Sequence, residues 1–314
     1  MAPTITTLIL GAGGIGTSFA AVFRDAGATV HLVDPDAGAR DVALGRIAAH
    51  AEAISLSGQS RGGAGAVHLQ SDMAEGLAAA DLVLECGPED LAFKQVVFRK
   101  MLDGARADAV LATASSAIPM SRIVPDTADQ RRCLVAHPVN PPAVLRVVEL
   151  CPAPGTDPAT MTRATDLLTA VRFVPVAMQR EVEGFLLNRL QSAVLREAYR
   201  LVDEGVADVD ALDTVMRLGL GPRWALSGPF ETAELNTPGG IAAHAARMGP
   251  AYARIGAARG ETVDWHPDLV ARVAAERTAL RAGQSRGARR AWRTRAVARL
   301  VAARDALMDD PDGG

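Results

Sequence analysis

The sequence predicts an α/β fold, in which a doubly wound, mostly parallel sheet is followed by a smaller all-α domain. Three observations lead to this prediction. Short apolar segments alternate with helical segments up to about residue 182, as in open sheets covered by helices. A glycine-rich turn directly follows the first apolar segment, which is typical of a βαβ unit. Beyond residue 183 the strand pattern ends, and the apolar residues recur at helical spacing.

Length and composition agree with a two-domain protein. The 314 residues suit two domains better than one, and we expect the α/β domain to span residues 1–182 and the helical domain residues 183–314. Hydrophobic residues make up 49% of the chain, enough to form ordered cores. The formal net charge of −3 gives no overall attraction to nucleic acid or to an anionic membrane.

The individual elements follow from the apolar pattern. Segments that read as strands are 5–10, 29–33, 80–86, 109–114, 132–137, 146–151 and 173–178. Segments that read as helices are 17–26, 39–54, 91–102, 158–170, 186–204, 209–217, 240–259, 267–282 and 288–308. The last of these carries many arginines, which we interpret as a solvated helix face rather than a nucleic-acid site because little aromatic surface accompanies them.

The cysteines indicate a reduced compartment. Cys86, Cys133 and Cys151 are odd in number and widely spaced, so we expect neither a disulfide framework nor a metal site. The first residues lack the features of a signal peptide, and no apolar stretch is long enough to span a membrane. We therefore expect a cytoplasmic protein with no membrane partner.

The glycine-rich turn has the spacing of a dinucleotide-binding loop. Gly11, Gly13 and Gly16 form G-x-G-x-x-G between a strand and a helix. The first glycine permits a tight turn, the second lets the backbone approach a pyrophosphate, and the third allows the helix to pack on the strand. The N-terminus of the following helix offers free N–H groups to the phosphates.

An acidic residue stands at the end of the second strand, where a dinucleotide-binding (Rossmann) domain carries one. Asp34 ends the second strand, 18 residues after Gly16. Its carboxylate can accept hydrogen bonds from the ribose hydroxyls and would repel a 2′-phosphate, which favours NAD over NADP. A structural glycine turn, or a site for FAD or S-adenosylmethionine, is the alternative.

One histidine has a pattern suited to catalysis. His137 follows an apolar segment at the predicted end of a strand, and Glu149 lies twelve residues later in another strand. If the two strands are neighbours, the carboxylate can contact the imidazole, fix its tautomer and prepare it as a general base.

The sequence around this histidine resembles the 3-hydroxyacyl-CoA dehydrogenase superfamily, and most of all its lambda-crystallin or L-gulonate 3-dehydrogenase branch. The motif AHPVNPPAVLRVVEL carries the resemblance, together with the glycine loop. Further matching stretches are ECGPEDLAFK, REVEGFLLNRLQ and AYRLVDEGVADVDALDTVMRLGLGPRWALSGPFET. The resemblance implies an NAD-dependent oxidation of a 3-hydroxyl group.

The resemblance also implies roles for single residues. His137 matches the catalytic histidine and Glu149 the acidic residue that orients it. Ser116 matches the serine that binds the reacting oxygen, with Ser115 as the alternative if the alignment is shifted by one. Asn188 matches an asparagine that reaches the site. From the residues alone, Ser116 reads equally as a loop hydroxyl and Asn188 as a helix cap.

Two further positions match cofactor residues, and one concerns the substrate. Glu89 and Lys94 match residues beside the nicotinamide ribose. Arg223 lies in a stretch where L-gulonate and L-carnitine dehydrogenases carry an arginine, and a guanidinium can bind a carboxylate bidentately. A contact between helices or subunits explains Arg223 equally well. Residues 42–65 contain only two basic side chains, Arg46 and Arg61, which makes a CoA site less expected.

These observations predict a dehydrogenase that oxidises a free 3-hydroxy acid with NAD. The first alternative is a 3-hydroxyacyl-CoA dehydrogenase, and the second is a non-catalytic NAD-binding protein of the lambda-crystallin kind. Because both His137 and Glu149 are present, we expect activity. The resemblance further implies a homodimer formed through the helical domain.

Overall fold

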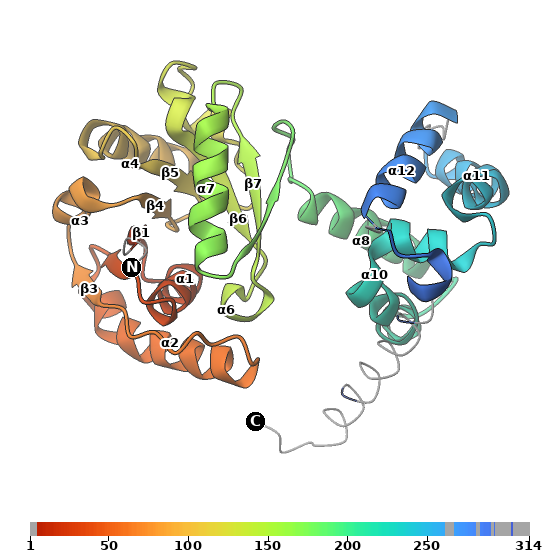
Figure 1. The fold of residues 1–314 in the computed structure, drawn as a ribbon, viewed down its shortest axis with the longest axis horizontal. Helices are drawn as coiled ribbons and strands as arrows, with labels where there is room; N and C mark the ends of the chain where they lie inside the picture. Colours follow the sequence, from red (N-terminus) through yellow and green to blue (C-terminus); the bar gives the residue numbers. More distant parts are fainter. Residues whose placement is uncertain (1–4, 261–266, 281–282, 290–291, 293–302, 304–314) are drawn as a thin grey trace. The chain divides into compact units, whose positions relative to one another are not determined.

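The computed structural model describes residues 5–260, 267–280, 283–289, 292 and 303. Its contacts divide the chain into two compact units, Met1–Leu195 and Arg196–Gly314 (Figure 1). The first unit contains a sheet flanked by helices, and the described part of the second is helical. The predicted fold class is thereby confirmed. The predicted domain boundary after residue 182, at the end of the sheet, stays a prediction.

The sheet of the first unit has eight strands. They are β1 Thr6–Leu10, β2 Thr29–Val33, β3 Val67–Gln70, β4 Leu82–Glu85, β5 Val110–Thr113, β6 Cys133–Pro138, β7 Val147–Pro152 and β8 Val174–Ala177. Their order is β3-β2-β1-β4-β5-β6-β7-β8. All pairs are parallel except β6 with β7. From β1 the chain adds strands β2 and β3 on one side, and from β4 it adds strands on the other side, so the direction of strand addition changes between β1 and β4. In such sheets ligands bind beside the carboxyl ends of the strands at that point.

Helices cover both faces of this sheet. They are α1 Gly14–Asp25, α2 Ala37–Leu56, α3 Ala74–Ala79, α4 Leu91–Gly104, α5 Met120–Ile123, the 3-10 helix η1 Asp129–Arg132, α6 Pro142–Leu145 and α7 Pro158–Ala170. Side chains alternate along each strand, so Ile9 of β1 joins the core beneath α1 while Leu8 joins the core beneath α4. Because both faces of the central strands are buried, β1, β4, β5 and β6 are mostly apolar, as the sequence pattern indicated, whereas the edge strands β3 and β8 are only partly buried or exposed.

The helical elements of the second unit begin with a helix that starts in the first. They are α8 Leu187–Asp203, α9 Val209–Thr214, the π-helix η2 Val215–Leu220, α10 Gly221–Asn236, α11 Gly240–Ala258 and α12 Pro267–Leu280. Arg289, in the arginine-rich segment, forms an ion pair with Glu231. Most of the helix predicted at 288–308 lies outside the described residues.

The short elements α3, α5, η1 and α6 were not predicted, and three further differences have a cause that the sequence shows. Strand β3 was not expected, because its four residues include His68 and Gln70 and lack a clear apolar period. Helix α10 was not expected, because Gly228 and Pro229 interrupt it; Gly228 has φ 57° there. The helix predicted at 209–217 ends at Thr214 and continues as η2. None of these differences involves the strands that carry the candidate site.

No helix among the described residues is both long and apolar enough to cross a membrane. Within the same residues, His, Cys, Asp and Glu side chains form no cluster that could bind a metal ion. The three cysteines, all of them described, are free thiols.

Candidate active site

The glycine loop connects β1 to α1, and its three glycines meet different surroundings. Gly11 has φ 104°, and a Cβ there would lie 2.7 Å from the carbonyl oxygen of Cys86. A Cβ on Gly16 would overlap the carbonyl oxygen of Gly11, whereas one on Gly13 would meet nothing within 4 Å. Gly11 and Gly16 are therefore required by the packing of the loop, and Gly13 leaves open space at the first turn of α1.

Asp34 joins the end of β2 to this loop. Its Oδ2 accepts a hydrogen bond from the N–H of Ala12 at 2.8 Å, and its Oδ1 accepts one from Asp36 at 3.0 Å. Gly13 is the N-cap of α1, and no side chain caps the helix there. An open loop, an uncapped helix N-terminus and a neighbouring carboxylate together fit the pyrophosphate and ribose of a dinucleotide.

His137 and Glu149 form a buried pair at the carboxyl end of β6. The two residues are opposite each other in the antiparallel register of β6 and β7, and their Nδ1 and Oε2 atoms are 2.7 Å apart. His137 is 6% exposed and Glu149 3%. The ring of Phe185 lies against the imidazole, with the ring centroids 5.5 Å apart. The neighbouring strands expected for this pair are thus present.

The second oxygen of Glu149 is also held. Oε1 accepts hydrogen bonds from the backbone N–H groups of Leu186 and Leu187, each at 2.8 Å. Burial alone would raise the pKa of Glu149, but the hydrogen bonds from His137, Leu187 and Leu186 outweigh it and lower the pKa below its ordinary value. An ionised carboxylate only accepts hydrogen bonds, so Nδ1 of His137 carries the proton in this pair.

The segment after β5 carries both candidate serines. Ser116 is exposed, whereas Ser115 is 1% exposed and its Oγ donates to Oε1 of Glu89 at 2.6 Å. Nδ2 of Asn188 donates to the carbonyl oxygen of Ser116 at 2.8 Å. The structure therefore brings Ser116, Asn188 and Glu89 together. Ser116 is the exposed one of the two serines, and its Oγ donates to Oε1 of Glu89 at 3.3 Å.

Lys94 is buried among carboxylates. It is 1% exposed, and its Nζ lies 2.8 Å from Oε2 of Glu85 and 3.4 Å from Oε2 of Glu89. Burial would raise the pKa of Glu89, but hydrogen bonds from Ser115, Ala117 and Ser116 and the charge of Lys94 together lower it. Sequence reasoning missed Glu85, although it stands in the motif ECGPEDLAFK, because only the fold brings it to Lys94.

A basic residue beside the glycine loop was also missed. Nη1 of Arg46, on α2, donates to the carbonyl oxygen of Ala12 at 2.9 Å. This contact brings a guanidinium to the loop between Gly11 and Gly13. From the sequence, Arg46 was a candidate only for a CoA contact.

Arg223 belongs to the second unit, at the start of α10. Its Nε donates to the carbonyl oxygen of Gly219 at 3.1 Å. The side chain lines a cavity of about 530 Å³ whose walls include Trp224, Phe230 and Tyr252. The cavity is therefore largely apolar, with a guanidinium in its wall.

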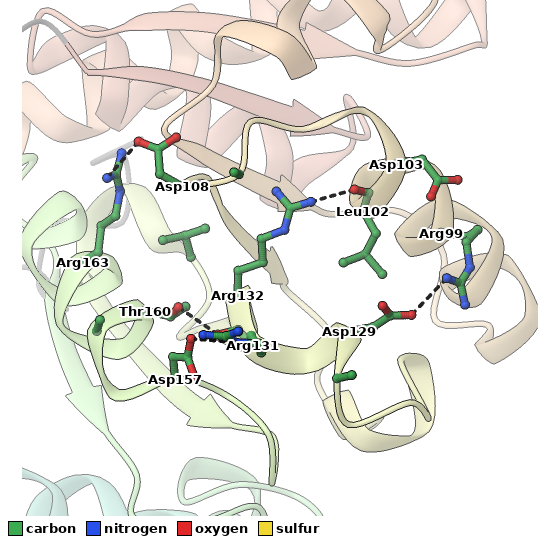
Figure 2. A pocket seen from close by; sticks show the side chains of 14 residues that line it. Arg99, Leu102, Asp103, Asp108, Asp129, Arg131, Arg132, Asp157, Thr160 and Arg163 are labelled. Atoms are coloured by element: carbon green, nitrogen blue, oxygen red, sulfur yellow. Dashed lines mark hydrogen bonds and ion pairs between the residues drawn. The ribbon is translucent and has the colours of Figure 1, made fainter.

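A larger cavity, of about 690 Å³, lies beside the N-terminal ends of β5 and β6, away from the carboxyl end that carries His137. Figure 2 shows that its arginines are already engaged with neighbouring groups. Arg99 pairs with Asp129, Arg131 with Asp157 and Arg163 with Asp108, while Arg132 donates to the carbonyl oxygen of Leu102. These interactions are those of a structural ion-pair network, so this cavity does not compete with the His137 site as a candidate.

Two family models match the chain. The model of the 3-hydroxyacyl-CoA dehydrogenase NAD binding domain matches residues 6–182, and that of the C-terminal domain of the same family matches residues 184–282. The chain belongs to the 3-hydroxyacyl-CoA dehydrogenase family. The family predicted from the motifs is confirmed, and with it an NAD-dependent oxidoreductase.

Relatives within the family carry different names. The chain is 39% identical to the lambda-crystallin homolog of Rattus norvegicus, over 74% of this chain and 75% of that protein. It is 35% identical to a 3-hydroxyacyl-CoA dehydrogenase of Gibberella moniliformis, over 78% of each. It is 32% identical to the L-carnitine dehydrogenase of a Pseudomonas species, over 72% and 71%.

Solved structures show the same fold. The 5-formyl-3-hydroxy-2-methylpyridine 4-carboxylic acid 5-dehydrogenase, described as an NAD+ dependent dismutase, has a TM-score of 0.74 at 25% identity and covers 97% of this chain and 99% of its own. The 3-hydroxyacyl-CoA dehydrogenase of Archaeoglobus fulgidus has a TM-score of 0.68 at 25% identity, with coverage of 83% and 84%. The family thus includes relatives whose names refer to free acids and others whose names refer to CoA thioesters.

Proposed function

We propose that this enzyme oxidises the 3-hydroxyl of a free 3-hydroxy acid, either L-gulonate-like or carnitine-like, with His137 as the general base. The observation that carries the proposal is the buried pair of His137 and Glu149, with 2.7 Å between Nδ1 and Oε2. A base held in this way is what the oxidation of an alcohol by a nicotinamide cofactor requires.

The chemistry divides between the cofactor and the protein. NAD, when bound, supplies the hydride acceptor. The glycine loop and Asp34 would hold the dinucleotide, with Glu89 and Lys94 on the side of the nicotinamide ribose. Because Glu149 holds the proton of His137 on Nδ1, Nε2 is the atom that would take the proton of the substrate hydroxyl. The negative charge of Glu149 would stabilise the imidazolium so formed.

Ser116 and Asn188 complete the proposed site. The exposed hydroxyl of Ser116 would donate to the substrate oxygen, and Asn188 holds the Ser116 segment by its bond to the carbonyl oxygen. Ser115 is a poorer candidate because it is buried, whereas Ser116 is exposed; the hydroxyls of both serines donate to Oε1 of Glu89, at 2.6 Å and 3.3 Å.

Two observations favour a free acid over a thioester. The L-carnitine dehydrogenase relatives and Arg223 fit a carboxylate substrate, since a guanidinium binds a carboxylate with paired hydrogen bonds. Residues 42–65 hold only two basic side chains, and neither is left for the phosphates of CoA: Arg46 lies beside the glycine loop, where it donates to the carbonyl oxygen of Ala12 and would serve NAD, and Arg61 donates to that of Ala170. A 3-hydroxyacyl-CoA substrate remains the alternative, supported by the name of the Gibberella moniliformis relative.

We also propose that the enzyme is a homodimer formed through its helical domain. Helix α8 is strongly amphipathic, yet no residue of it is buried within the chain. Its apolar side chains include Leu190 at 64% exposed and Tyr199 at 75%. A second copy covering this face would bury these side chains, and light scattering of a Tyr199→Glu variant should then show monomers.

A reduced compartment such as the cytoplasm is proposed from the cysteines. All three are unpaired, and burial raises the pKa of Cys133 to about 12 and that of Cys151 to about 11. Neutral, buried thiols of this kind have a structural rather than a reactive role.

Absorbance of NADH tests the proposed function. The purified protein is mixed with NAD and, in turn, L-gulonate, L-carnitine, 3-hydroxybutyrate and 3-hydroxybutyryl-CoA, with His137→Ala as the control. We expect turnover of a free acid that the control lacks. Turnover of the thioester alone would refute the free-acid proposal, while the roles assigned to His137 and Glu149 would stand. Absence of all turnover, with NAD still bound, would favour a binding protein.

Arg223→Ala separates the proposed substrate contact from a structural one. Loss of a charge-assisted contact should raise KM for the acid by about tenfold or more, with a smaller change in kcat. Arg217→Ala, an exposed arginine in the preceding helix η2, is the matched control. An unchanged KM in Arg223→Ala would show that this arginine does not bind the substrate.

A further inference from the structure

A wholly buried carboxylate lies at the carboxyl end of β4, beneath the proposed site. Glu85 is 0% exposed. Its Oε2 accepts from Nζ of Lys94 at 2.8 Å and from Oγ1 of Thr113 at 2.6 Å. Its Oε1 accepts from Nζ of Lys94 at 3.1 Å and from the N–H of Gly87 at 2.7 Å. Both oxygens are thus saturated by protein groups, so Glu85 does not itself bind a ligand.

The segment from Ser115 to Ile118 is held in an unusual way. Each of its four backbone N–H groups donates to a side-chain oxygen. Ser115 N–H donates to Oγ1 of Thr113 at 3.1 Å, those of Ser116 and Ala117 to Oε1 of Glu89 at 3.0 Å, and that of Ile118 to Oγ of Ser115 at 2.8 Å. The position of Ser116 therefore depends on Thr113 and Glu89 rather than on a backbone ladder.

Glu85 is connected to this segment by two chains of contacts. In the first, Thr113 donates to Glu85 and accepts from the N–H of Ser115. In the second, Lys94 bridges Glu85 to Glu89, which accepts from the N–H of Ser116. The Thr113 hydroxyl has one proton, which it donates to Glu85, so toward Ser115 the hydroxyl oxygen can act only as an acceptor.

We propose that Glu85 is a positioning residue for the oxidation, which acts through Thr113 and through Lys94 and Glu89 to set where Ser116 presents its hydroxyl. The proposal rests on the function proposed for Ser116 above. Buried ion pairs stabilise a fold weakly, and apolar residues of similar volume often replace them without loss, but a fully satisfied buried network holds its members in one geometry. Here the network ends at Ser116, whose N–H and hydroxyl both donate to Glu89.

A double-mutant cycle on kcat tests the positioning role. Thr113→Val preserves shape and removes the hydroxyl that links Glu85 to Ser115. We expect it to lower kcat by about tenfold, an effect on the scale of one lost hydrogen bond, with KM for NAD little changed. In the Ser116→Ala background the same substitution should have no further effect, because the hydroxyl that it displaces is gone. Glu85→Gln should behave alike.

The matched control is Thr7→Val. Thr7 is also 0% exposed and stands in β1, which pairs with β4 on the side away from β5. Its Oγ1 donates to the carbonyl oxygen of Leu82 at 3.0 Å, with no link to the Ser116 segment. It should lower the melting temperature by a similar amount and leave kcat unchanged. The proposal would be overturned if Thr113→Val lowered kcat by the same factor in the parent and in the Ser116→Ala background. It would also be overturned if Thr7→Val lowered kcat as much as Thr113→Val does.

Hydrogen exchange supplies a readout that needs no turnover. Thr113→Val should speed exchange of the amides of 115–118 by about tenfold, and Thr7→Val should not. Unchanged protection in Thr113→Val would overturn the proposal even in an active enzyme. Faster exchange in a protein that oxidises no hydroxy acid would instead show that the proposed function has failed while the network does hold the segment. If Ser116→Ala keeps full kcat, Ser116 has no role in the reaction and the positioning role of Glu85 is refuted as well. This conclusion does not depend on the result for His137→Ala.

Discussion

Nδ1 of His137 lies 2.7 Å from Oε2 of Glu149, and the two residues face each other directly across the antiparallel strands β6 and β7. Strand pairing alone thus brings together two residues that stand twelve apart in the sequence. The remaining oxygen of Glu149 is bound by the N–H groups of Leu186 and Leu187. The carboxylate is held from both sides, and the imidazole is held by the carboxylate.

Glu149→Gln should therefore lower kcat by about 100-fold, because general-base catalysis contributes at least this much and the amide no longer stabilises an imidazolium. NAD affinity should not change, since the glycine loop is untouched. Stopped-flow measurement of NADH formation at saturating substrate checks the rate. Glu181→Gln is the control, because Glu181 binds Ser121 and not His137. A Glu149→Gln enzyme within twofold of the parent would contradict the assigned pair.

The same carboxylate should make stability depend on pH. The pKa of Glu149 is lowered in the folded protein, so its contribution to stability is complete above the unfolded value of about 4.3. The contribution is lost as pH falls through the lowered folded pKa. The melting temperatures of the parent and Glu149→Gln should thus differ most above about pH 5 and converge as the pH falls below the unfolded value of about 4.3. A constant difference across that range would show that the pKa is not lowered.

Two glycines of the loop should respond differently to alanine. Gly13→Ala should fold normally, since its Cβ meets nothing within 4 Å, but should bind NAD poorly because the methyl group occupies the pyrophosphate approach. Gly16→Ala should lose about 1–3 kcal/mol of stability, because the methyl group overlaps the backbone of Gly11. Calorimetric melting and NAD titration separate the two effects.

Gly45→Ala is the control for that pair. It lies within α2 with open space around its Cβ, so alanine should stabilise the helix by about 1 kcal/mol. Equal melting temperatures for Gly13→Ala and Gly16→Ala would contradict the packing described for Gly16.

Arg46→Ala should weaken NAD binding by about five- to tenfold, because its guanidinium sits beside the loop that would hold the pyrophosphate. The loss should shrink in high salt, because salt screens the attraction between the guanidinium of the parent protein and the pyrophosphate. Arg61→Ala is the matched control from the same region, since Arg61 binds the carbonyl oxygen of Ala170 instead. Equal NAD affinities for the two variants, measured by titration calorimetry, would rule out a cofactor contact for Arg46.

Local sequence signals predicted the parts of this site that lie close together along the chain. The spacing of Gly11, Gly13 and Gly16, the acid at Asp34 and the two strands around His137 were all readable, because each depends on a pattern of a few residues. The network of Glu85 was not, because it joins Glu85 to a threonine 28 residues away. No local pattern specifies such a contact, which arises only when β4 and β5 pair.

Strand β7 is buried and apolar on both of its faces, with Val148 and Leu150 on one and Cys151 on the other. Hydrophobic burial therefore discriminates poorly between the observed alignment with β6 and one shifted by a single residue. A shift would turn Glu149 to the opposite face and leave its charge buried without a partner, at a cost of several kcal/mol. The pair proposed to perform the reaction is thus also the pair that selects the alignment of the two strands, and a variant that loses its charge loses part of the information that specifies its fold.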